Sequence, residues 1–335
     1  MMDYSTKDTT VCGSSTIVNH LPEIGLQKAV SEIVDGLLAC PKRMSCKYFY
    51  DTEGSKLFNE ITRLPEYYPA RTEKEILRKL PLKNLIGSGD IDITELGSGN
   101  HAKITIILDR LSSEQLSHIR YLPVDISRSS LETSIRAITG RFPGLSIQGI
   151  TADYYHQMHL IPGERKKLLC FLGSTIGNLD RDDAMSFVRN IAESMQPGDG
   201  FLIGFDRLKS AALLESAYND RQGLTARFNK NILCVVNRLM QSDFDPEDFE
   251  HRAFYNPEQR RIEMHLEAKR AVHVKCPSMA IPLDLQKGET IHTENSHKFD
   301  VNDIQTVGEH AGLSLYRIFS DKNEWFSLAY YKKMS

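Results

Sequence analysis

The sequence has no closely spaced pair of cysteines and no histidine spacing typical of a metal site. Among its 6 cysteines and 11 histidines there is neither a CxxC pair nor an HExxH pattern, which argues against a zinc site or a disulfide framework. Scattered cysteines are typical of a reducing compartment. We therefore predict no bound metal and a cytoplasmic location. The cysteines are Cys12, Cys40, Cys46, Cys170, Cys234 and Cys276.

The sequence also lacks a long apolar run and an excess of positive charge. No run approaches the ~18 residues of a membrane span, and the polar start "MMDYSTKDTTVCGSS" has no secretory signal pattern. Because 41 Lys and Arg face 44 Asp and Glu, no basic field exists to hold nucleic acid or an anionic membrane. The sequence thus predicts neither partner.

Short apolar runs alternate with helical patterns in the middle of the chain. This alternation is typical of βαβ units around a parallel sheet. Two later runs, "SLYRIF" and "WFSLAYYKK", are close enough to form a hairpin. We predict the α/β class, with a doubly wound, Rossmann-like sheet. The five runs in the middle of the chain are residues 91–96, 121–124, 145–150, 168–173 and 201–205.

The alternation stops after Asp206, which indicates an inserted unit. Residues 208–240 have helical patterns and residues 252–295 have strand patterns, before the sheet-like texture returns. Near the start, apolar spacing predicts a helix over 26–40, and Thr72 with Glu75 predicts a helix beginning in a capping box. We predict three parts. They are a flexible tail (1–20), an α+β substrate-binding domain (21–71 with 208–297) and a sheet domain (72–207 with 298–335).

The segment "ITELGSGNHAKI" predicts a nucleotide-binding loop. Gly97, Gly99 and Ala102 satisfy the dinucleotide fingerprint, although a tight turn without a ligand has the same glycines. Glu95 stands before the first glycine, where an acid suits a ligand that carries an amine. Asp125 closes the next strand later than the ~20 residues expected for a dinucleotide ribose contact.

S-adenosylmethionine fits this pattern better than a nicotinamide cofactor. Its adenosine moiety suits Asp125 and Asp153, which end the second and third strands, and its amino-acid moiety suits the glycine loop. Carboxyl ends of parallel strands line the crevice where open α/β sheets bind ligands. A nicotinamide-dependent dehydrogenase remains the alternative from a different reaction class.

The late segment "HTENSHKF" has two interpretations, an imidazole clamp and a surface strand. Glu294 and Ser296 are two residues apart, so on a strand their side chains share a face. An imidazole can donate from one nitrogen and accept at the other. From these residues alone a wet surface strand is the simpler interpretation, because such side chains are mostly exposed.

Seven segments together resemble the histidine-specific Nα-methyltransferases of the ergothioneine pathway, from about residue 25 onward. They are "KYFYDTEGSKLFNEITRLPEYYPARTEKEIL", "ELGSG", "FLGSTIGNL", "AYND", "GLTARFNKNIL", "RIEMHL" and "HTENSHKF". The resemblance implies an S-adenosylmethionine-dependent methyltransferase that converts L-histidine, through mono- and dimethyl intermediates, to the trimethyl betaine hercynine. It also implies a methyltransferase domain with an inserted substrate domain. We expect a monomer.

The resemblance further implies roles for particular residues. Tyr67, Asn178 and Tyr218 would hold the amine and carboxylate, and a backbone carbonyl at Gly173 would lie near the amine. Glu294 and Ser296 would contact the imidazole. Tyr50 and Met264 would line the pocket. The cofactor positions are Glu95, Gly97, Gly99, Lys103, Asp125 and Asp153, of which Glu95 and Gly99 follow from the glycine loop alone.

Several of these residues also have a purely structural interpretation, and the reaction has alternatives. Tyr50, Tyr67 and Met264 would otherwise be packing residues, and Asn178 would be a helix N-cap. Related fungal enzymes methylate a tryptophan derivative, so another aromatic acceptor is the nearest alternative. A non-catalytic adenosylmethionine-binding sensor is another. The pair Arg207-Leu208 in "GFDRLKS" departs from many bacterial members.

Overall fold

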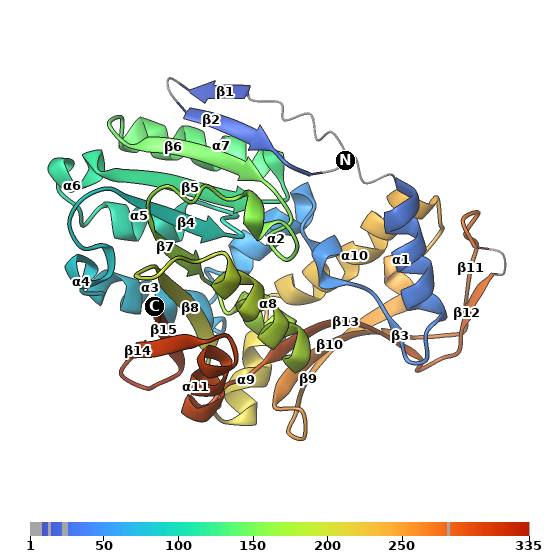
Figure 1. Ribbon diagram of the computed structural model, residues 1–335. Helices are drawn as coiled ribbons and strands as arrows, with labels where there is room; N and C mark the ends of the chain where they lie inside the picture. The colour runs from blue at the N-terminus through green and yellow to red at the C-terminus, as the bar shows by residue number, and fades with distance from the viewer. Residues whose placement is uncertain (1–8, 13–14, 22–25, 280–281, 335) are drawn as a thin grey trace. The chain divides into compact units, whose positions relative to one another are not determined.

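The computed structural model describes residues 9–12, 15–21, 26–279 and 282–334. The chain forms two compact units (Figure 1). The first unit comprises residues 1–22, 72–207 and 299–335, and the second comprises residues 23–71 and 208–298. Each unit is described by itself. Across the described residues, no helix is long and apolar enough to cross a bilayer.

A nine-stranded sheet forms the centre of the first unit. Its order is β1-β2-β6-β5-β4-β7-β8-β15-β14, with parallel pairing from β2 to β8 and antiparallel pairing at both ends. The order reverses at β4, which is the switch point of a doubly wound sheet. The strands are β1 (Thr9–Cys12), β2 (Ser15–Asn19), β4 (Ile91–Leu96), β5 (Ile119–Asp125), β6 (Ser146–Thr151), β7 (Lys166–Phe171), β8 (Gly200–Asp206), β14 (Leu313–Ser320) and β15 (Phe326–Lys333).

The sheet of the first unit is buried on both faces. Along β7, Leu168 and Cys170 join one apolar cluster, whereas Leu169 and Phe171 join the other. Because neighbouring side chains of a strand point to opposite faces, a continuous apolar run is what such a strand requires. The helices of this unit are α4 (Leu82–Ile86), α5 (Ala102–Leu108), α6 (Ser113–Ser117), α7 (Arg128–Arg141), α8 (Arg181–Glu193), α11 (Val301–His310), η2 (Met158–Leu160) and η3 (Thr175–Asn178).

The second unit combines a four-stranded sheet with helices. Its sheet has the order β3-β13-β10-β9, and a separate hairpin joins β11 and β12. The long helix α10 packs against α2, η1 and β9. Its elements are α1 (Leu26–Leu38), β3 (Lys42–Arg43), η1 (Cys46–Phe49), α2 (Thr52–Ile61), α9 (Ala211–Tyr218), α10 (Leu224–Met240), η4 (Pro246–Asp248), β9 (Phe249–Asn256), β10 (Arg261–Ala268), β11 (Val272–Val274), β12 (Leu283–Leu285) and β13 (Thr290–His297).

The predicted fold class is confirmed, including the terminal hairpin of β14 and β15. The flexible tail is wrong for residues 9–12 and 15–19, which are strands β1 and β2. β2 extends the parallel sheet beside β6, and its Ile17 is fully buried. A run of β-branched residues in "STIVN" suits a strand. The rest of the predicted tail lies outside the described residues, apart from His20.

The predicted start of one helix is also wrong. Helix α3 spans Tyr68–Lys79, so Thr72 lies inside it and does not cap it. Pro69 occupies the first turn, where proline is favoured because that N–H has no helical partner. Glu75 pairs with Lys79 one turn later, at 2.7 Å between Nζ and Oε1.

Candidate active site

The glycine loop of the first unit lies at the carboxyl end of β4. Gly97 and Gly99 have φ angles of +66° and +47°, which favour glycine. Asp125, at the end of β5, accepts hydrogen bonds from the Gly99 N–H and the Ser127 N–H, both at 2.9 Å. The loop is therefore fixed by a carboxylate from the neighbouring strand.

Several groups around this loop fit S-adenosylmethionine. Within the described residues, the buried Oγ of Ser98 has no hydrogen-bond partner, and a buried orphan of this kind indicates a missing ligand contact. A carboxylate offers about four acceptor sites, so Asp125 retains acceptors for a ribose hydroxyl. Asp153 follows β6, where its Oδ1 accepts from the Tyr155 N–H at 3.0 Å.

Glu95 is a buried acid on β4, next to the loop. Burial raises its pKa to about 7, against a hydrogen bond from the Tyr121 hydroxyl and the charge of Lys103, which lower it. The Tyr121 Oη lies 2.5 Å from the Glu95 Oε2. A nearby cation would favour the ionised form of this carboxyl, and the ammonium group of S-adenosylmethionine would be such a cation.

Glu73 organises the turn after β7, a role that the sequence analysis did not predict. Its side chain is 1% exposed. Its Oε1 accepts from the Gly173 N–H at 2.7 Å, and its Oε2 lies 2.9 Å from the Lys103 Nζ. Gly173 has φ +91°, a conformation that other residues rarely adopt. One carboxylate therefore fixes the Gly173 peptide and holds Lys103.

Asn178 closes the same turn. It is the last residue of η3, and Asp180 occupies the N-cap position of α8. The alternative in which Asn178 caps the following helix is thus not what the structure shows. Within the described part of the chain no hydrogen bond reaches the half-buried Asn178 amide. An amide with both ends available suits ligand binding.

In the second unit, Glu294 lies on β13 beside a β-bulge. Met264 pairs with Glu294 and the next residue, His265, pairs with His292, so Thr293 is the extra residue. The Thr293 hydroxyl donates to the Asn229 Oδ1 at 2.7 Å, and its oxygen lies 3.0 Å from the Met264 carbonyl oxygen. Bulges re-aim side chains next to functional sites. Here the bulge brings Glu294 beside Met264, whose side chain is 1% exposed.

The Glu294 side chain on β13 is half-buried. Across the described residues, no hydrogen bond or ion pair reaches it. Burial raises its pKa to about 7, and the charge of Lys298 only partly opposes this. Burial, and after it the charge of Glu294, raises the pKa of the Cys46 thiol to about 12 and the pKa of Tyr50 well above its usual value. Such an unpaired acid is a candidate functional group.

Ser296 lies two residues further along β13, and two polar groups contact its hydroxyl. The Tyr218 hydroxyl donates to its Oγ at 2.7 Å, and the Lys298 Nζ donates to it at 2.7 Å. The Tyr218 hydroxyl comes from the end of α9, and Ser296 is 5% exposed. The structure therefore joins Tyr218 to the predicted clamp rather than leaving it as a separate group.

Aromatic side chains of the second unit surround these groups. Tyr67 packs edge-on against Tyr218 and Phe58, with ring centroids 6.2 and 6.1 Å apart. Tyr50 packs edge-on against Phe58 and Phe228, at 5.7 and 5.8 Å. Ring faces of this kind can hold a permanent cation, worth ~0.5–2 kcal/mol each.

A buried network fixes the backbone around Tyr218. The Asn229 Nδ2 donates to the His251 Nδ1 and to the His265 carbonyl, both at 2.9 Å. The His251 Nε2 donates to the Tyr218 carbonyl at 2.9 Å. Burial lowers the pKa of His251, so a single neutral tautomer satisfies both contacts. Asn229 and His251 are positioning residues that the sequence did not reveal.

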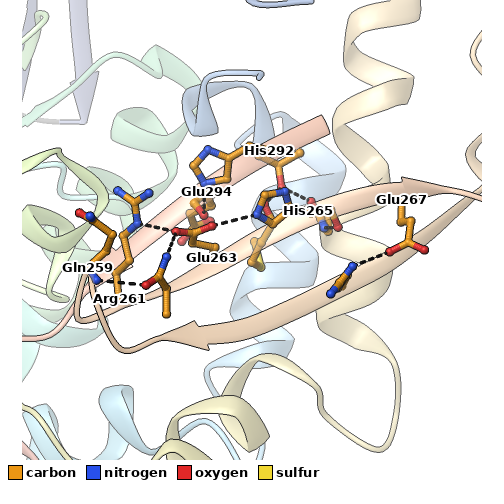
Figure 2. A network of polar contacts seen from close by, with 12 residues as sticks. Gln259, Arg261, Glu263, His265, Glu267, His292 and Glu294 are labelled. Atoms are coloured by element: carbon orange, nitrogen blue, oxygen red, sulfur yellow. Dashed lines mark hydrogen bonds and ion pairs between the residues drawn. The ribbon is translucent and has the colours of Figure 1, made fainter. Parts of the chain in front are cut away.

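The reverse face of the same strands carries a polar network (Figure 2). The Glu263 carboxylate accepts from the Arg261 Nε at 2.8 Å and contacts the His265 Nε2 at 3.2 Å. Glu263, His265 and His292 present ligand atoms within 4.8 Å of one another. However, the His265 and His292 rings are stacked at an angle of 27°, so their in-plane lone pairs converge poorly on one ion. Because Arg261 also repels a cation, we assign this cluster a structural role.

We expect Glu294→Gln to stabilise the protein without ligands at pH 8 but hardly at pH 4.5. The folded-state pKa of this carboxyl is about 7, above its pKa in the unfolded chain. The folded protein is therefore not penalised while the carboxyl is protonated in both states, and it loses stability as the pH rises from the unfolded-state pKa through 7. The expected gain in unfolding free energy at pH 8 is about 1–3 kcal/mol. Urea unfolding of both proteins at the two pH values measures it. An equal difference at both pH values would contradict the assigned pKa.

Comparison with known proteins agrees with this arrangement. The model of the family described as histidine-specific methyltransferase, S-adenosylmethionine-dependent, matches residues 29–333. The chain belongs to this family. Its fold and cofactor class are thereby established, and the nicotinamide-dependent dehydrogenase alternative is set aside.

Individual relatives carry the names of different activities. Histidine N-alpha-methyltransferase of Mycolicibacterium smegmatis is 38% identical over 94% of this chain and 98% of its own. Ergothioneine biosynthesis protein 1 of Schizosaccharomyces pombe is 32% identical over 67% of this chain and 30% of its own. The 4-dimethylallyltryptophan N-methyltransferase of Claviceps purpurea is 27% identical over 95% of this chain and 96% of its own.

The predicted residues thus divide between the two units. The first unit brings together Glu95, Gly97, Gly99, Lys103, Asp125, Asp153, Gly173 and Asn178. The second brings together Tyr50, Tyr67, Tyr218, Met264, Glu294 and Ser296.

In the pair Arg207-Leu208, which departs from many bacterial members, the structure explains the arginine. Arg207 is 9% exposed and donates to the Ser327 Oγ at 2.9 Å and the Phe299 carbonyl at 3.2 Å, so it ties β8 to neighbouring backbone.

Proposed function

We propose that this protein transfers three methyl groups from S-adenosylmethionine to the α-amine of L-histidine and so forms hercynine for ergothioneine synthesis. The observation that supports this best is the half-buried Glu294 carboxylate, unpaired in the described structure, two residues before Ser296 on β13. An acceptor and a hydroxyl at this spacing suit the two nitrogens of an imidazole. The second unit would then be the substrate-binding domain.

The first unit would hold the methyl donor. Gly97, Ser98, Gly99 and Asp125 would contact its polar groups, and Glu95 would attract its amine. When bound, S-adenosylmethionine supplies a methyl group on a sulfonium whose leaving group departs neutral, so no general acid is required. The protein's task is to present an amine with a free lone pair in line with that methyl group.

Residues around the amine would select its neutral form. An α-amine is largely protonated at neutral pH, and each of the three transfers needs a lone pair. The Asn178 amide oxygen and the Gly173 carbonyl would accept N–H bonds and so aim the lone pair. Tyr67 and Tyr218 would hold the carboxylate side of the substrate, and Tyr50 would face the growing cation. Positioning of this kind supplies at most ~7–11 kcal/mol.

The mono- and dimethyl intermediates would bind to the same residues, since each retains the imidazole that Glu294 and Ser296 hold. The free thiols of Cys40 and Cys234 are exposed, which supports a reducing, cytoplasmic location.

Mass spectrometry of the products tests the proposal directly. Purified protein is incubated with S-adenosylmethionine and a pool of free amino acids that includes tryptophan. We expect histidine to gain three methyl groups while the other amino acids stay unmodified. Methylation of another aromatic amino acid would support the alternative acceptor, and binding of the donor without any product would indicate a sensor. A reaction without protein is the control.

A further inference from the structure

Lys298 is a buried cation directly after β13. Its side chain is 0% exposed, which is rare for lysine and requires polar partners. Its Nζ lies 2.7 Å from the Ser296 Oγ, 3.5 Å from the Tyr218 hydroxyl and 5.2 Å from the centroid of the Tyr218 ring. Lys298 therefore contacts both hydroxyl groups of the proposed imidazole clamp.

The hydrogen bonds to Ser296 determine what its hydroxyl can still do. A serine hydroxyl has two acceptor lone pairs and one hydrogen. Lys298 is a donor only, and the Tyr218 hydroxyl donates to the same oxygen, so these two contacts use both lone pairs. The remaining capacity of Ser296 is its own O–H. Towards a ligand, Ser296 must therefore donate.

The two ends of the clamp then have opposite hydrogen-bonding character. Glu294, when ionised, only accepts, while Ser296 only donates. A neutral imidazole matches this pair, because it has one N–H and one nitrogen lone pair. An imidazolium has two N–H groups, so one of them would face the Ser296 donor. An indole has an N–H but no acceptor nitrogen, and it would leave the Ser296 hydroxyl unpaired, which is costly.

We propose that Lys298 is a positioning residue that fixes Ser296 as a hydrogen-bond donor and thereby restricts the clamp to a neutral azole with one N–H and one acceptor nitrogen. This inference rests on the proposed function. Lys298 also acts on the other end of the clamp, because its charge favours the ionised form of Glu294. Cys46 and Tyr50 are the titratable groups that interact with the Glu294 charge, and a thiol or phenol with a raised pKa carries no charge near neutral pH.

A double-mutant cycle between Lys298 and Ser296 tests this role. Histidine kinetics are measured at pH 8.5, where the imidazole is neutral. Lys298→Met and Ser296→Ala should each lower kcat/KM for histidine by about 10- to 100-fold, mainly through KM. If Lys298 acts through Ser296, the kcat/KM of the double variant should be no lower than that of the less active single variant. Lys298→Arg, which keeps a donor, should recover part of the loss.

Three outcomes would overturn the role. Losses that multiply in the double variant would show that Lys298 acts independently of Ser296, and an unchanged histidine KM in Lys298→Met would show that it does not act on the clamp. A Lys298→Arg variant no better than Lys298→Met would also contradict it. If Lys298→Met does not bind S-adenosylmethionine in calorimetry and so has not folded, the cycle is made with Lys298→Arg and Tyr218→Phe, which change one Ser296 donor each.

Failure of the proposed function is distinguishable from failure of this inference. A wild-type protein that does not methylate histidine would contradict the proposed function itself. Multiplicative losses in a protein that does methylate histidine would contradict only the role of Lys298.

Discussion

Replacing Glu294 by alanine should lower kcat/KM for histidine by about 10²- to 10³-fold and leave the affinity for S-adenosylmethionine within about twofold. The imidazole N–H would lose a charged acceptor in a desolvated site, where an unpaired donor costs several kcal/mol. Glu294 is not among the residues proposed to hold the donor, so we expect donor binding to stay the same. Steady-state kinetics and titration calorimetry measure the two quantities.

Glu267→Ala is a matched control for this variant. Glu267 lies on the neighbouring strand β10, where its Oε2 pairs with the Arg252 Nη1 at 2.9 Å, and it is not part of the clamp. A half-exposed ion pair of this kind contributes little, so we expect its histidine kinetics to stay within about twofold of wild type. Equal losses of histidine turnover and of donor affinity in Glu294→Ala would contradict the clamp.

The sequence was sufficient for the sheet and for the pattern of the clamp because both depend on short-range periodicity. Continuous apolar runs such as residues 168–171 identify strands buried on both faces, and a spacing of two residues places Glu294 and Ser296 on one face. The bulge at Thr293 was not predictable, because it depends on how β13 pairs with β10. Likewise the pairing of β2 with β6 joins segments far apart in the sequence, so the β-branched run "STIVN" alone did not reveal it.

Residues that act through distant contacts left no local signal. Glu73 reaches Gly173 across 100 positions of sequence, and in the sequence it was overlooked beside Glu75, which matched a capping pattern. Lys298 follows the clamp motif closely, but its burial comes from the fold and not from its neighbours. Composition also predicted it as a surface residue, as lysines usually are.

Glu73 provides the second prediction with a large effect. Glu73→Ala should lower kcat for histidine methylation by about 10- to 100-fold, because the Gly173 N–H would lose its acceptor and the Gly173 peptide would be free to turn. That N–H belongs to the Leu172–Gly173 peptide, and the Gly173 carbonyl proposed to aim the amine lone pair belongs to the next peptide, so a rotation at Gly173 would displace it. Small misplacements of a reacting group are costly. Single-turnover kinetics at saturating histidine and donor measure the chemical step.

Glu73→Gln separates this role from general destabilisation. Glutamine keeps a carbonyl oxygen for the Gly173 N–H but loses the charge that pairs with Lys103, whose side chain is 25% exposed and can turn to solvent. We therefore expect Glu73→Gln to keep kcat within about threefold of wild type while both variants lose stability in thermal unfolding. If instead the glutamine and alanine variants lost kcat equally, the ion pair with Lys103, and not the orientation of the Gly173 peptide, would be what catalysis requires from Glu73.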